Sequence, residues 1–231
     1  MGLKDDLETY CIDVFGSAWT TRDGTVVPDE DSKLGLKNEA IKIKGSVLYA
    51  DLADSTLMVD KEIPGVSAEV YKCFLYCCAR IIPHNEGSVT AYDGDRIMGV
   101  FIGKDKDTNA ANAALNIKWA VDEIVMPKMR AIYATKSFQI KHVTGIDTSE
   151  LFVAKTGARG ANDLVWVGRA ANYAAKLAAL DPSYTYITSD VYDAMNNSVK
   201  FVNGNAMWVK MIWNEFNNSY IYRSSYRQSF R

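Results

Sequence analysis

The stretch Lys44-Gly-Ser-Val-Leu-Tyr-Ala-Asp-Leu-Ala-Asp-Ser-Thr56 decides the fold class of this chain. Residues 46–50 form a short apolar run that ends at Asp51, as a buried strand does. The next apolar pattern, over 67–84, has helical spacing and predicts an amphipathic helix. Strand-like segments at 89–92 and 96–102 then flank Asp93-Gly94-Asp95, which is typical of a hairpin turn. The sequence therefore predicts the order strand, helix, hairpin.

The remainder of the chain continues to alternate between strand and helix patterns. We expect a long alanine-rich helix over 107–129, a hairpin of 139–148 with 151–156, a helix over 169–180, a strand at 184–188, a short helix at 190–195, and a strand pair of 207–212 with 219–223. This order predicts the α+β class, with a mixed sheet flanked by helices.

The two ends of the chain differ in texture from its centre. Residues 1–43 read as an N-terminal arm, with a short amphipathic helix near 3–15 followed by a stretch rich in turn residues and acids. Residues 44–223 form the main domain, and the polar tail 224–231 is expected to be frayed.

Composition excludes several classes of protein. The 231 residues carry 26 Lys and Arg against 28 Asp and Glu, so a nucleic-acid partner is not expected. Acids at the N-terminus argue against a secretory signal, and the most apolar stretch, 70–82, is too short to span a membrane. We therefore expect a cytoplasmic protein with no membrane partner, whose four cysteines are core thiols because they form no C-x-x-C pair.

Two aspartates are candidates for a metal site. Asp51 ends a strand and Asp95 lies in a tight turn, so the two carboxylates converge if their strands are neighbours. Paired hard oxygen ligands suit Mg²⁺ or Mn²⁺. The alternative is structural: Asp95 would be a turn residue chosen together with Gly94, and Asp51 a strand-end cap.

Two further segments could contact a nucleotide. Ser55 and Thr56 follow the strand end, where backbone N–H groups opening a helix could hold phosphates, although helix capping explains both residues nearly as well. Asn172 and Lys176 are four residues apart and therefore share one helix face among small alanines. The alternative there is an ordinary solvated helix face.

Three segments together resemble the class III nucleotidyl cyclases. They are VLYADLADST (47–56), YDGDRIMGVF (92–101) and VGRAANYAAKL (167–177), which match the signature segments of that family in order and spacing. The resemblance covers about 44–222. It implies that the main domain is a ferredoxin-like catalytic domain that acts as a head-to-tail homodimer, with active sites shared between the chains.

The resemblance also implies residue roles. Asp51 and Asp95 match the two metal-binding aspartates, and the backbone carbonyl of Leu52 matches a further ligand, so two divalent ions, Mn²⁺ or Mg²⁺, are implied per site. Asn172 matches the asparagine that orients the ribose of a nucleoside triphosphate. Lys176 stands where the family usually has an arginine that stabilises the transition state, and it would act there as a point charge.

Lys210 and Asp54 complete the comparison with the family. Lys210 resembles a lysine that binds triphosphate in some members, and the alternative is a surface lysine on a strand. Asp54 stands where many cyclases have glycine, and we expect its side chain to point away from the triphosphate or to assist the metal.

The base-reading positions depart from the purine cyclases. Ala91 lies four residues before Asp95, and Val165 lies seven before Asn172, so both positions are apolar where purine cyclases read the base with polar groups. A pocket without those groups cannot select adenine or guanine through paired polar contacts. Tyr92 is a candidate to fill space beside a smaller ring, with a core aromatic as the favoured alternative.

This pattern is similar to the pyrimidine cyclases of bacterial Pycsar antiphage systems. The resemblance implies an enzyme that converts UTP or CTP to the 3′,5′-cyclic monophosphate and pyrophosphate, a second messenger read by a separate effector. Two alternatives remain open at the level of sequence: a purine (adenylate) cyclase, and an inactive cyclase-like dimer that binds nucleotide. A diguanylate cyclase ranks last because the paired-glycine signature is missing.

Overall fold

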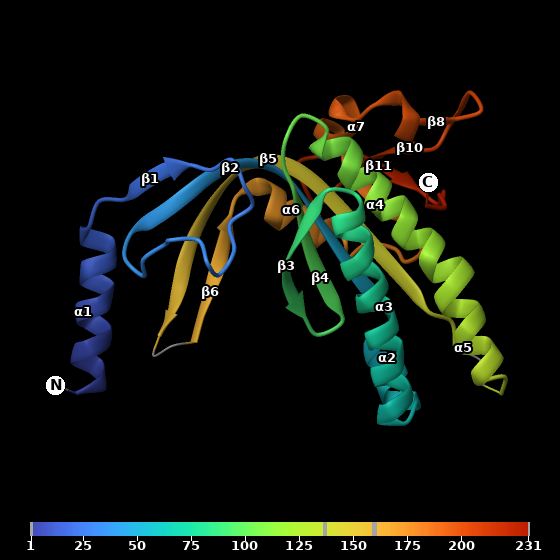
Figure 1. Cartoon of the computed structure of the whole chain (residues 1–231), viewed down its shortest axis with the longest axis horizontal. Coiled ribbons are helices and arrows are strands. Elements are labelled where there is room, and N and C mark those ends of the chain that lie inside the picture. The colour runs from blue at the N-terminus through green and yellow to red at the C-terminus, as the bar shows by residue number, and fades with distance from the viewer. Residues whose placement is uncertain (1, 136–137, 159–160, 231) are drawn as a thin grey trace.

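A single mixed sheet organises the chain in the computed structural model, which describes residues 2–135, 138–158 and 161–230 (Figure 1). Its strand order is β10-β11-β7-β5-β2-β4-β3, with β1 added beside β2 and β6 beside β5. Most neighbours are antiparallel, whereas β1 with β2 and β5 with β7 are parallel. The predicted α+β class with a mixed sheet is confirmed.

The centre of the sheet has the ferredoxin-like arrangement. Strands β2 (Glu39–Ala53), β3 (Gly87–Asp93), β4 (Arg96–Phe101) and β5 (Lys141–Ala158) follow the chain order strand, helix, strand, strand, helix, strand. In space they lie in the order β5-β2-β4-β3, so the first and last strands of the unit, β2 and β5, lie side by side, and the hairpin of β3 and β4 forms one edge of the sheet. This register brings Asp51 of β2 directly opposite Arg96 of β4.

Helices cover both faces of the sheet. On one face lie α2 (Ser55–Lys61), α3 (Pro64–His84), α4 (Lys106–Ala120), a π-helical segment (Val121–Val125) and α5 (Met126–Ile132). Every second residue of β2 packs into this layer, because strand side chains alternate between faces. These residues are Leu48, Ala50 and Leu52.

The opposite face carries α6 (Arg169–Leu177), which packs on β5 and β2. A close approach of helix and strand makes this possible at Gly145, where an added Cβ would lie 2.2 Å from the carbonyl oxygen of Ala174. Val47 and Tyr49 point to this face, and therefore so does the next residue in the alternation, Asp51.

The predicted hairpin of 139–148 with 151–156 is wrong. Residues 141–158 form one continuous strand, because Ser149 and Glu150 pair with Gly45 and Lys44 of β2 and leave no turn between them. The hairpin partner of β5 is instead β6 (Ala161–Val167), which the sequence analysis did not identify as a strand.

The C-terminal part forms one edge of the sheet. It contains β7 (Thr185–Thr188), α7 (Ser189–Ala194), a 3-10 turn (Asn197–Val199), the small pair β8 (Phe201–Val202) and β9 (Asn205–Ala206), and the edge strands β10 (Val209–Trp213) and β11 (Ser219–Ser224). The expected helices and strands of this region are confirmed within a few residues.

The tail is not frayed. Asn116 of α4 donates a 2.8 Å hydrogen bond to the carbonyl of Gln228, and the ring of Phe230 packs edge-on against Trp119 at 5.2 Å. Arg227 adds ion pairs to Asp122 and Glu123. The composition of the tail is polar, but its backbone is held by one buried asparagine, which a sequence pattern does not reveal.

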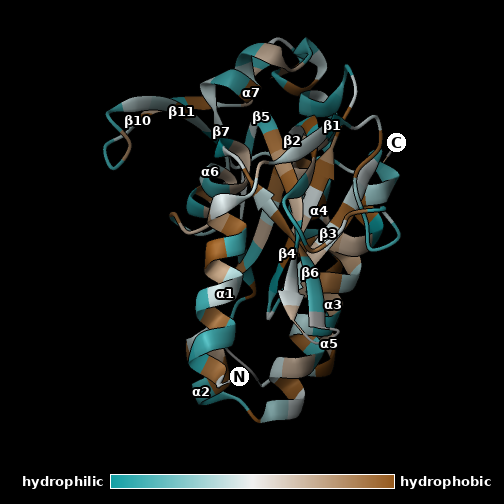
Figure 2. Cartoon of the chain, turned by 90° about the vertical axis from the view of Figure 1, so that its left-hand side faces the viewer, coloured by the Kyte–Doolittle hydropathy of each residue, from teal (hydrophilic) through white to brown (hydrophobic). Residues whose placement is uncertain are grey.

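The N-terminal arm begins with α1 (Leu3–Gly16) and β1 (Thr20–Asp23), and none of the residues of α1 is buried. Strand β1 pairs with the first residues of β2, which starts at Glu39. Apolar side chains lie exposed along α1. In Figure 2 the ribbon of this helix alternates between hydrophobic and hydrophilic residues. Met1 and Arg231, the outer ends of the predicted arm and tail, lie outside the described residues.

The four cysteines differ in burial. Cys78 is buried, Cys77 is half-buried, and Cys11 and Cys73 are exposed, so the expectation that all four are core thiols is wrong. Cys73 lies on the side of α3 that faces solvent, and the sequence pattern alone does not show which side that is.

Among the described residues, no helix is long and apolar enough to cross a membrane.

Candidate active site

Asp51 lies at the centre of the candidate site, near the end of β2. Its Oδ2 accepts hydrogen bonds from Nε and Nη2 of Arg96, at 3.1 and 2.8 Å. Burial raises the pKa of Asp51, the contacts with Arg96 oppose that rise, and the nearby carboxylates of Asp95 and Asp93 add to it. The strand end therefore gathers acidic groups around one arginine.

Asp95 occupies the turn between β3 and β4. Its neighbour Gly94 has φ of +61°, a left-handed conformation that glycine adopts without strain, and the two residues close the hairpin. Oδ2 of Asp95 is buried, yet it has no hydrogen-bond partner in the described part of the chain. A buried carboxylate oxygen without a partner is costly, so it calls for a cation or another ligand.

The donor set fits a hard divalent cation. The carboxylate of Asp95 contributes to raising the pKa of Asp51. Both residues present carboxylate oxygens, which are the ligands that Mg²⁺ and Mn²⁺ prefer. The side chain of Leu52 is buried in the core, so only its backbone carbonyl could contribute. Among the described residues no group of three or more His, Cys, Asp or Glu side chains is placed to hold a metal. Further ligands would thus come from backbone, substrate or water, as is usual for Mg²⁺.

Asn172 and Lys176 lie on α6, both exposed and on one helix face, as predicted. Nζ of Lys176 is 4.7 Å from the centroid of the Phe216 ring, in the turn between β10 and β11. No hydrogen bond or ion pair within the described ranges joins either residue to Asp51 or Asp95. One chain therefore does not bring the two halves of the predicted site into contact.

An ion pair between an exposed arginine and a buried aspartate orients α6. Arg169, the first residue of the helix, donates to both carboxylate oxygens of Asp147 on β5, at 3.0 and 3.1 Å. Thr188 of β7 donates a third hydrogen bond to Asp147, at 2.6 Å, and Arg169 also pairs with Asp190. Because burial raises the pKa of Asp147, these donors are needed to keep it ionised. The network fixes the helix that carries Asn172 and Lys176.

The predicted base-pocket residues lie on two different strands. Ala91 is half-buried on β3, and Val165 is 39% exposed on β6. Tyr92 is 59% exposed, so the alternative that it is a core aromatic is wrong; it lies on β3, the edge strand of the sheet.

The predicted phosphate-binding residues begin α2. Ser55 and Thr56 are its first helical residues, while the N-cap is Asp54, so neither hydroxyl residue caps the helix. Lys210 lies exposed on the edge strand β10, with Nζ 3.7 Å from the centroid of the Tyr220 ring. The structure does not bring Lys210 into contact with Ser55 or Thr56, and these three assignments stay predictions.

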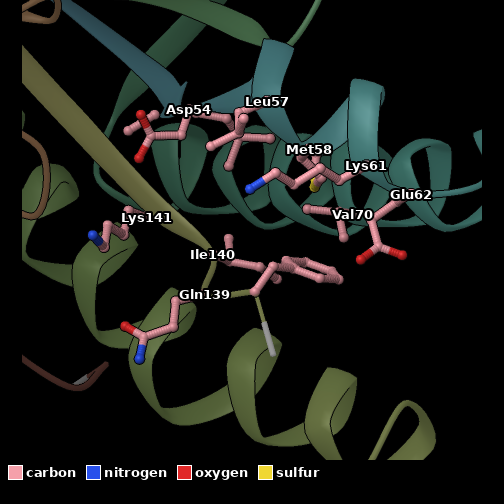
Figure 3. A pocket seen from close by; sticks show the side chains of 12 residues that line it. Asp54, Leu57, Met58, Lys61, Glu62, Val70, Gln139, Ile140 and Lys141 are labelled. Carbon is pink, nitrogen blue, oxygen red and sulfur yellow. The ribbon is translucent and has the colours of Figure 1, made fainter. Parts of the chain in front are cut away.

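Asp54 has φ of +58°, in the left-handed region that favours glycine. Its side chain lines a cavity of about 470 Å³ between α2 and the start of β5 (Figure 3). Lys61 and Lys141 line the same cavity, and in the close-up the carboxylate of Asp54 lies on the side of Lys141. Asp51 and Asp95 are not among its lining residues.

Sequence reasoning missed Arg96, Arg169 and Asp147. Arg96 directly follows the metal-site turn, and its pairing opposite Asp51 could have been found by aligning the two predicted strands. Asp147 carried no signal, because its partners, Arg169 of α6 and Thr188 of β7, come from two elements distant in sequence. Tyr49 was also missed; its ring lies beneath the guanidinium of Arg96, 5.9 Å from it.

Comparison with known proteins gives both fold and family. No family model matches the chain. Among solved structures, the guanylyl cyclase Cya2 superposes with a TM-score of 0.68 at 18% identity, covering 81% of this chain and 94% of that one. The adenylyl cyclase CyaB from P. aeruginosa gives 0.66 at 17% identity, covering 84% and 98%. At such identities these structures establish a shared cyclase fold.

Curated relatives are much closer in sequence. A uridylate cyclase from Xanthomonas perforans is 63% identical over 227 residues, covering 98% of both chains. A uridylate cyclase from Burkholderia cepacia is 46% identical, covering 93% of this chain and 94% of its own length. With near full-length identity to these relatives and the fold of the class III cyclases, the chain belongs to the uridylate cyclase family.

Proposed function

We propose that this protein is a pyrimidine nucleotide cyclase that converts UTP to 3′,5′-cyclic UMP and pyrophosphate. The observation that carries the proposal is the 63% identity over 98% of the chain with a relative named uridylate cyclase. In the reaction the ribose 3′-oxygen forms a bond to the α-phosphorus. The bond from the α-phosphorus to the bridging oxygen of the β-phosphate breaks, and pyrophosphate leaves.

Asp51 and Asp95 would hold two divalent ions, Mn²⁺ or Mg²⁺, which supply charge neutralisation and a more acidic 3′-hydroxyl when bound. The unpartnered buried oxygen of Asp95 supports this assignment. Arg96 keeps Asp51 ionised and ready for the cation, and Ser55, Thr56 and the first turn of α2 would lie along the triphosphate.

A second copy of the chain would complete each site. Asn172 and Lys176 are exposed on α6 and make no contact with the aspartates of their own chain. In a head-to-tail homodimer they would reach the partner's substrate, where Asn172 positions the ribose and Lys176 offsets charge on the phosphates. The ion pair of Arg169 with the buried Asp147 supports this role because it fixes the helix in advance.

The base would be read by shape and by the lack of purine-specific groups at Ala91 and Val165. The double variant Ala91→Lys, Val165→Asp would place unpaired polar groups beside a pyrimidine. Its kcat/KM for UTP should therefore fall by at least about tenfold. By the same resemblance, the product would be a second messenger in antiphage defence, read by a separate effector.

The decisive experiment offers the protein an equimolar mixture of UTP, CTP, ATP and GTP with Mn²⁺ and identifies the products by mass. We expect cyclic UMP as the main product, and no product from Asp95→Asn. Cyclic CMP as the main product would move the substrate to CTP. Predominant cyclic AMP or cyclic GMP, or no product at all, would overturn the proposal.

A further inference from the structure

Helix α1 presents an apolar stripe to solvent. Leu3, Leu7, Tyr10 and Val14 recur at helical spacing, and the first three are 71, 57 and 53% exposed. No residue of the helix is buried. A helix of 14 residues is marginally stable alone in water, so such a helix normally exists because a surface covers it.

The end of α1 is held in place by the body of the chain. Nδ2 of Asn38, a buried residue just before β2, donates 2.8 Å hydrogen bonds to the carbonyls of Val14 and Ser17. These contacts fix the direction in which α1 leaves the sheet. The stripe is therefore presented at a defined position. Tyr10 and Val14 line a cavity together with residues 36–39 of the same chain, whereas Leu3 and Leu7 are not among its lining residues.

An uncovered apolar groove lies elsewhere on the chain. It runs between α3 and the segment 121–133, has a volume of about 330 Å³, and is lined largely by apolar and thiol side chains, including Val70, Cys73, Tyr76, Ile124, Met129 and Ile132. Tyr76 and Ile132 are 67 and 75% exposed. Figure 1 shows α1 and the helices α3 and α5 at opposite ends of the sheet, so the groove is out of reach of α1 of the same chain.

The charges of the two surfaces are complementary. Helix α1 carries four acidic side chains against one lysine, whereas Lys128 lines the groove. Lys72 and Arg130 lie on the same two helices outside its lining, and none of these three cations has a carboxylate partner among the described residues. The acids near the groove are already engaged. Glu69 accepts a hydrogen bond from Tyr133, and Asp122 pairs with Lys118 and Arg227.

We propose that α1 of one copy docks into the groove between α3 and α5 of a second copy, and that the second copy returns the same contact. Such a reciprocal exchange closes the assembly at two chains. The inference rests on the dimer of the proposed function and adds an interface outside the shared active sites. The alignment with the Xanthomonas relative leaves only four of the 231 residues unmatched, so that relative also carries most of α1.

Two native thiols make the contact testable in the full chain. Cys11 lies on α1 and Cys73 lines the groove, and both are exposed. Docking would bring Cys11 of one copy near Cys73 of the other. A short bis-maleimide should therefore join two chains, and peptide mass spectrometry should identify a Cys11–Cys73 link. The background is Cys77→Ser, because Cys77 lies one turn from Cys73 and would compete for the reagent.

The matched variants distinguish the possible occupants of the groove. Cys11→Ser and Cys73→Ser, each in that background, should both abolish the joined dimer. A link that survives Cys73→Ser but not Cys11→Ser would show two α1 helices packed on each other and would overturn the groove as the docking site. Absence of any link at concentrations where the protein is dimeric by light scattering would overturn the inference as well.

A second measurement tests the energetics without any reagent. Leu7→Glu places a charge in the stripe, and Thr9→Glu places the same charge on the opposite side of α1. We expect Leu7→Glu to raise the dimer dissociation constant at least about tenfold and Thr9→Glu to leave it within about twofold, measured by sedimentation. Equal effects would contradict the docking. Cyclic UMP formation by Thr9→Glu is assayed in parallel, so loss of the proposed activity is distinguished from loss of the contact.

Discussion

Arg96 and Asp51 face each other across β4 and β2, and the guanidinium donates from both Nε and Nη2 to a single carboxylate oxygen, Oδ2. This leaves Oδ1 of Asp51 without a hydrogen bond among the described residues. The arginine therefore stabilises the ionised carboxylate without occupying both of its oxygens. The contact of the Arg96 guanidinium with the Tyr49 ring holds the arginine beside this strand end.

Replacing Arg96 with glutamine should move the acid limb of the pH–activity profile to higher pH. Arg96 lowers the pKa of Asp51, which burial and the nearby carboxylates raise, so its loss raises that pKa further. The carboxylate must be ionised to bind a cation. The profile is measured at saturating Mn²⁺, with Arg22→Gln on the exposed strand β1 as the control. If the acid limb of the pH–activity profile stayed at the wild-type pH, ionisation of Asp51 would not be what limits activity at low pH.

Asp51 and Asp95, the two proposed metal ligands, should differ in their effect on stability although we expect both to be needed for activity. Asp95→Ala removes a buried oxygen that has no partner, so the melting temperature without metal should hold or rise. Asp51→Ala deprives Arg96 of its partner, so it should cost about 1 to 3 kcal/mol. Neither variant should form cyclic UMP.

Asp93→Asn is the matched control for these two variants, because it removes an exposed carboxylate from the same hairpin. It should retain activity and melt near the wild-type temperature. Calorimetry in EDTA and product formation with Mn²⁺ check both parts. Near-normal turnover by Asp51→Ala or Asp95→Ala would remove that residue from the metal site.

Mixing two inactive variants should restore activity if the sites are shared between chains. In a heterodimer of Asp51→Ala with Asn172→Ala, one site carries both lesions and the other carries none. Random exchange makes half of the dimers mixed, and each has one intact site of two, so activity should return to about a quarter of wild type.

Exchange in this mixture is followed by native mass spectrometry, and Asp51→Ala mixed with Asp95→Ala is the control. Both of those lesions lie in the same half-site, so their mixture should stay inactive. Confirmed exchange without any recovery in the first mixture would contradict the roles given to Asn172 and Lys176.

His142 should make the fold sensitive to acid. It is buried on β5 beside the ring of Phe74, and burial, with Lys118 nearby, lowers its pKa from 6.5 to about 4. Between those values the unfolded chain binds a proton that the folded chain does not. The free energy of unfolding should therefore fall as pH drops from 6.5 to 4, by about 3 kcal/mol in total.

Denaturant unfolding at a series of pH values checks this expectation. The chain has one other histidine, His84, which is exposed, so His84→Gln is the matched control and should preserve the slope. His142→Gln should flatten it. A steep slope that survives His142→Gln would assign the acid sensitivity to another group.

Local patterns predicted the elements that depend on near neighbours. The run at 46–50 ending in Asp51, the turn Asp93-Gly94-Asp95 and the helical spacing of Asn172 and Lys176 all appear in the structure as expected. Each follows from steric and periodic rules that act over a few residues. The resemblance to the cyclases rested on the same short segments, and the near full-length relatives confirm it.

Local patterns failed where a partner distant in sequence decides the conformation. Ser149 and Glu150 were expected to lie in a turn, but pairing with β2 keeps them in an extended strand. The polar tail is ordered because Asn116 offers a donor to its backbone. In both cases a long-range hydrogen bond outweighs the local preference, and composition does not record which partner is present.

The sequence by itself determined the fold class and the family, and it predicted the two aspartates that we propose as metal ligands, because these depend on short motifs in a fixed order. Only the tertiary structure decided that Arg96 holds Asp51, that Asp147 and Arg169 orient α6, and that Asn172 lies out of contact with the aspartates of its own chain. The physical reason is that charge pairing and site completeness depend on distances between residues that are far apart along the chain. Those distances exist only once the strands have taken their order in the sheet.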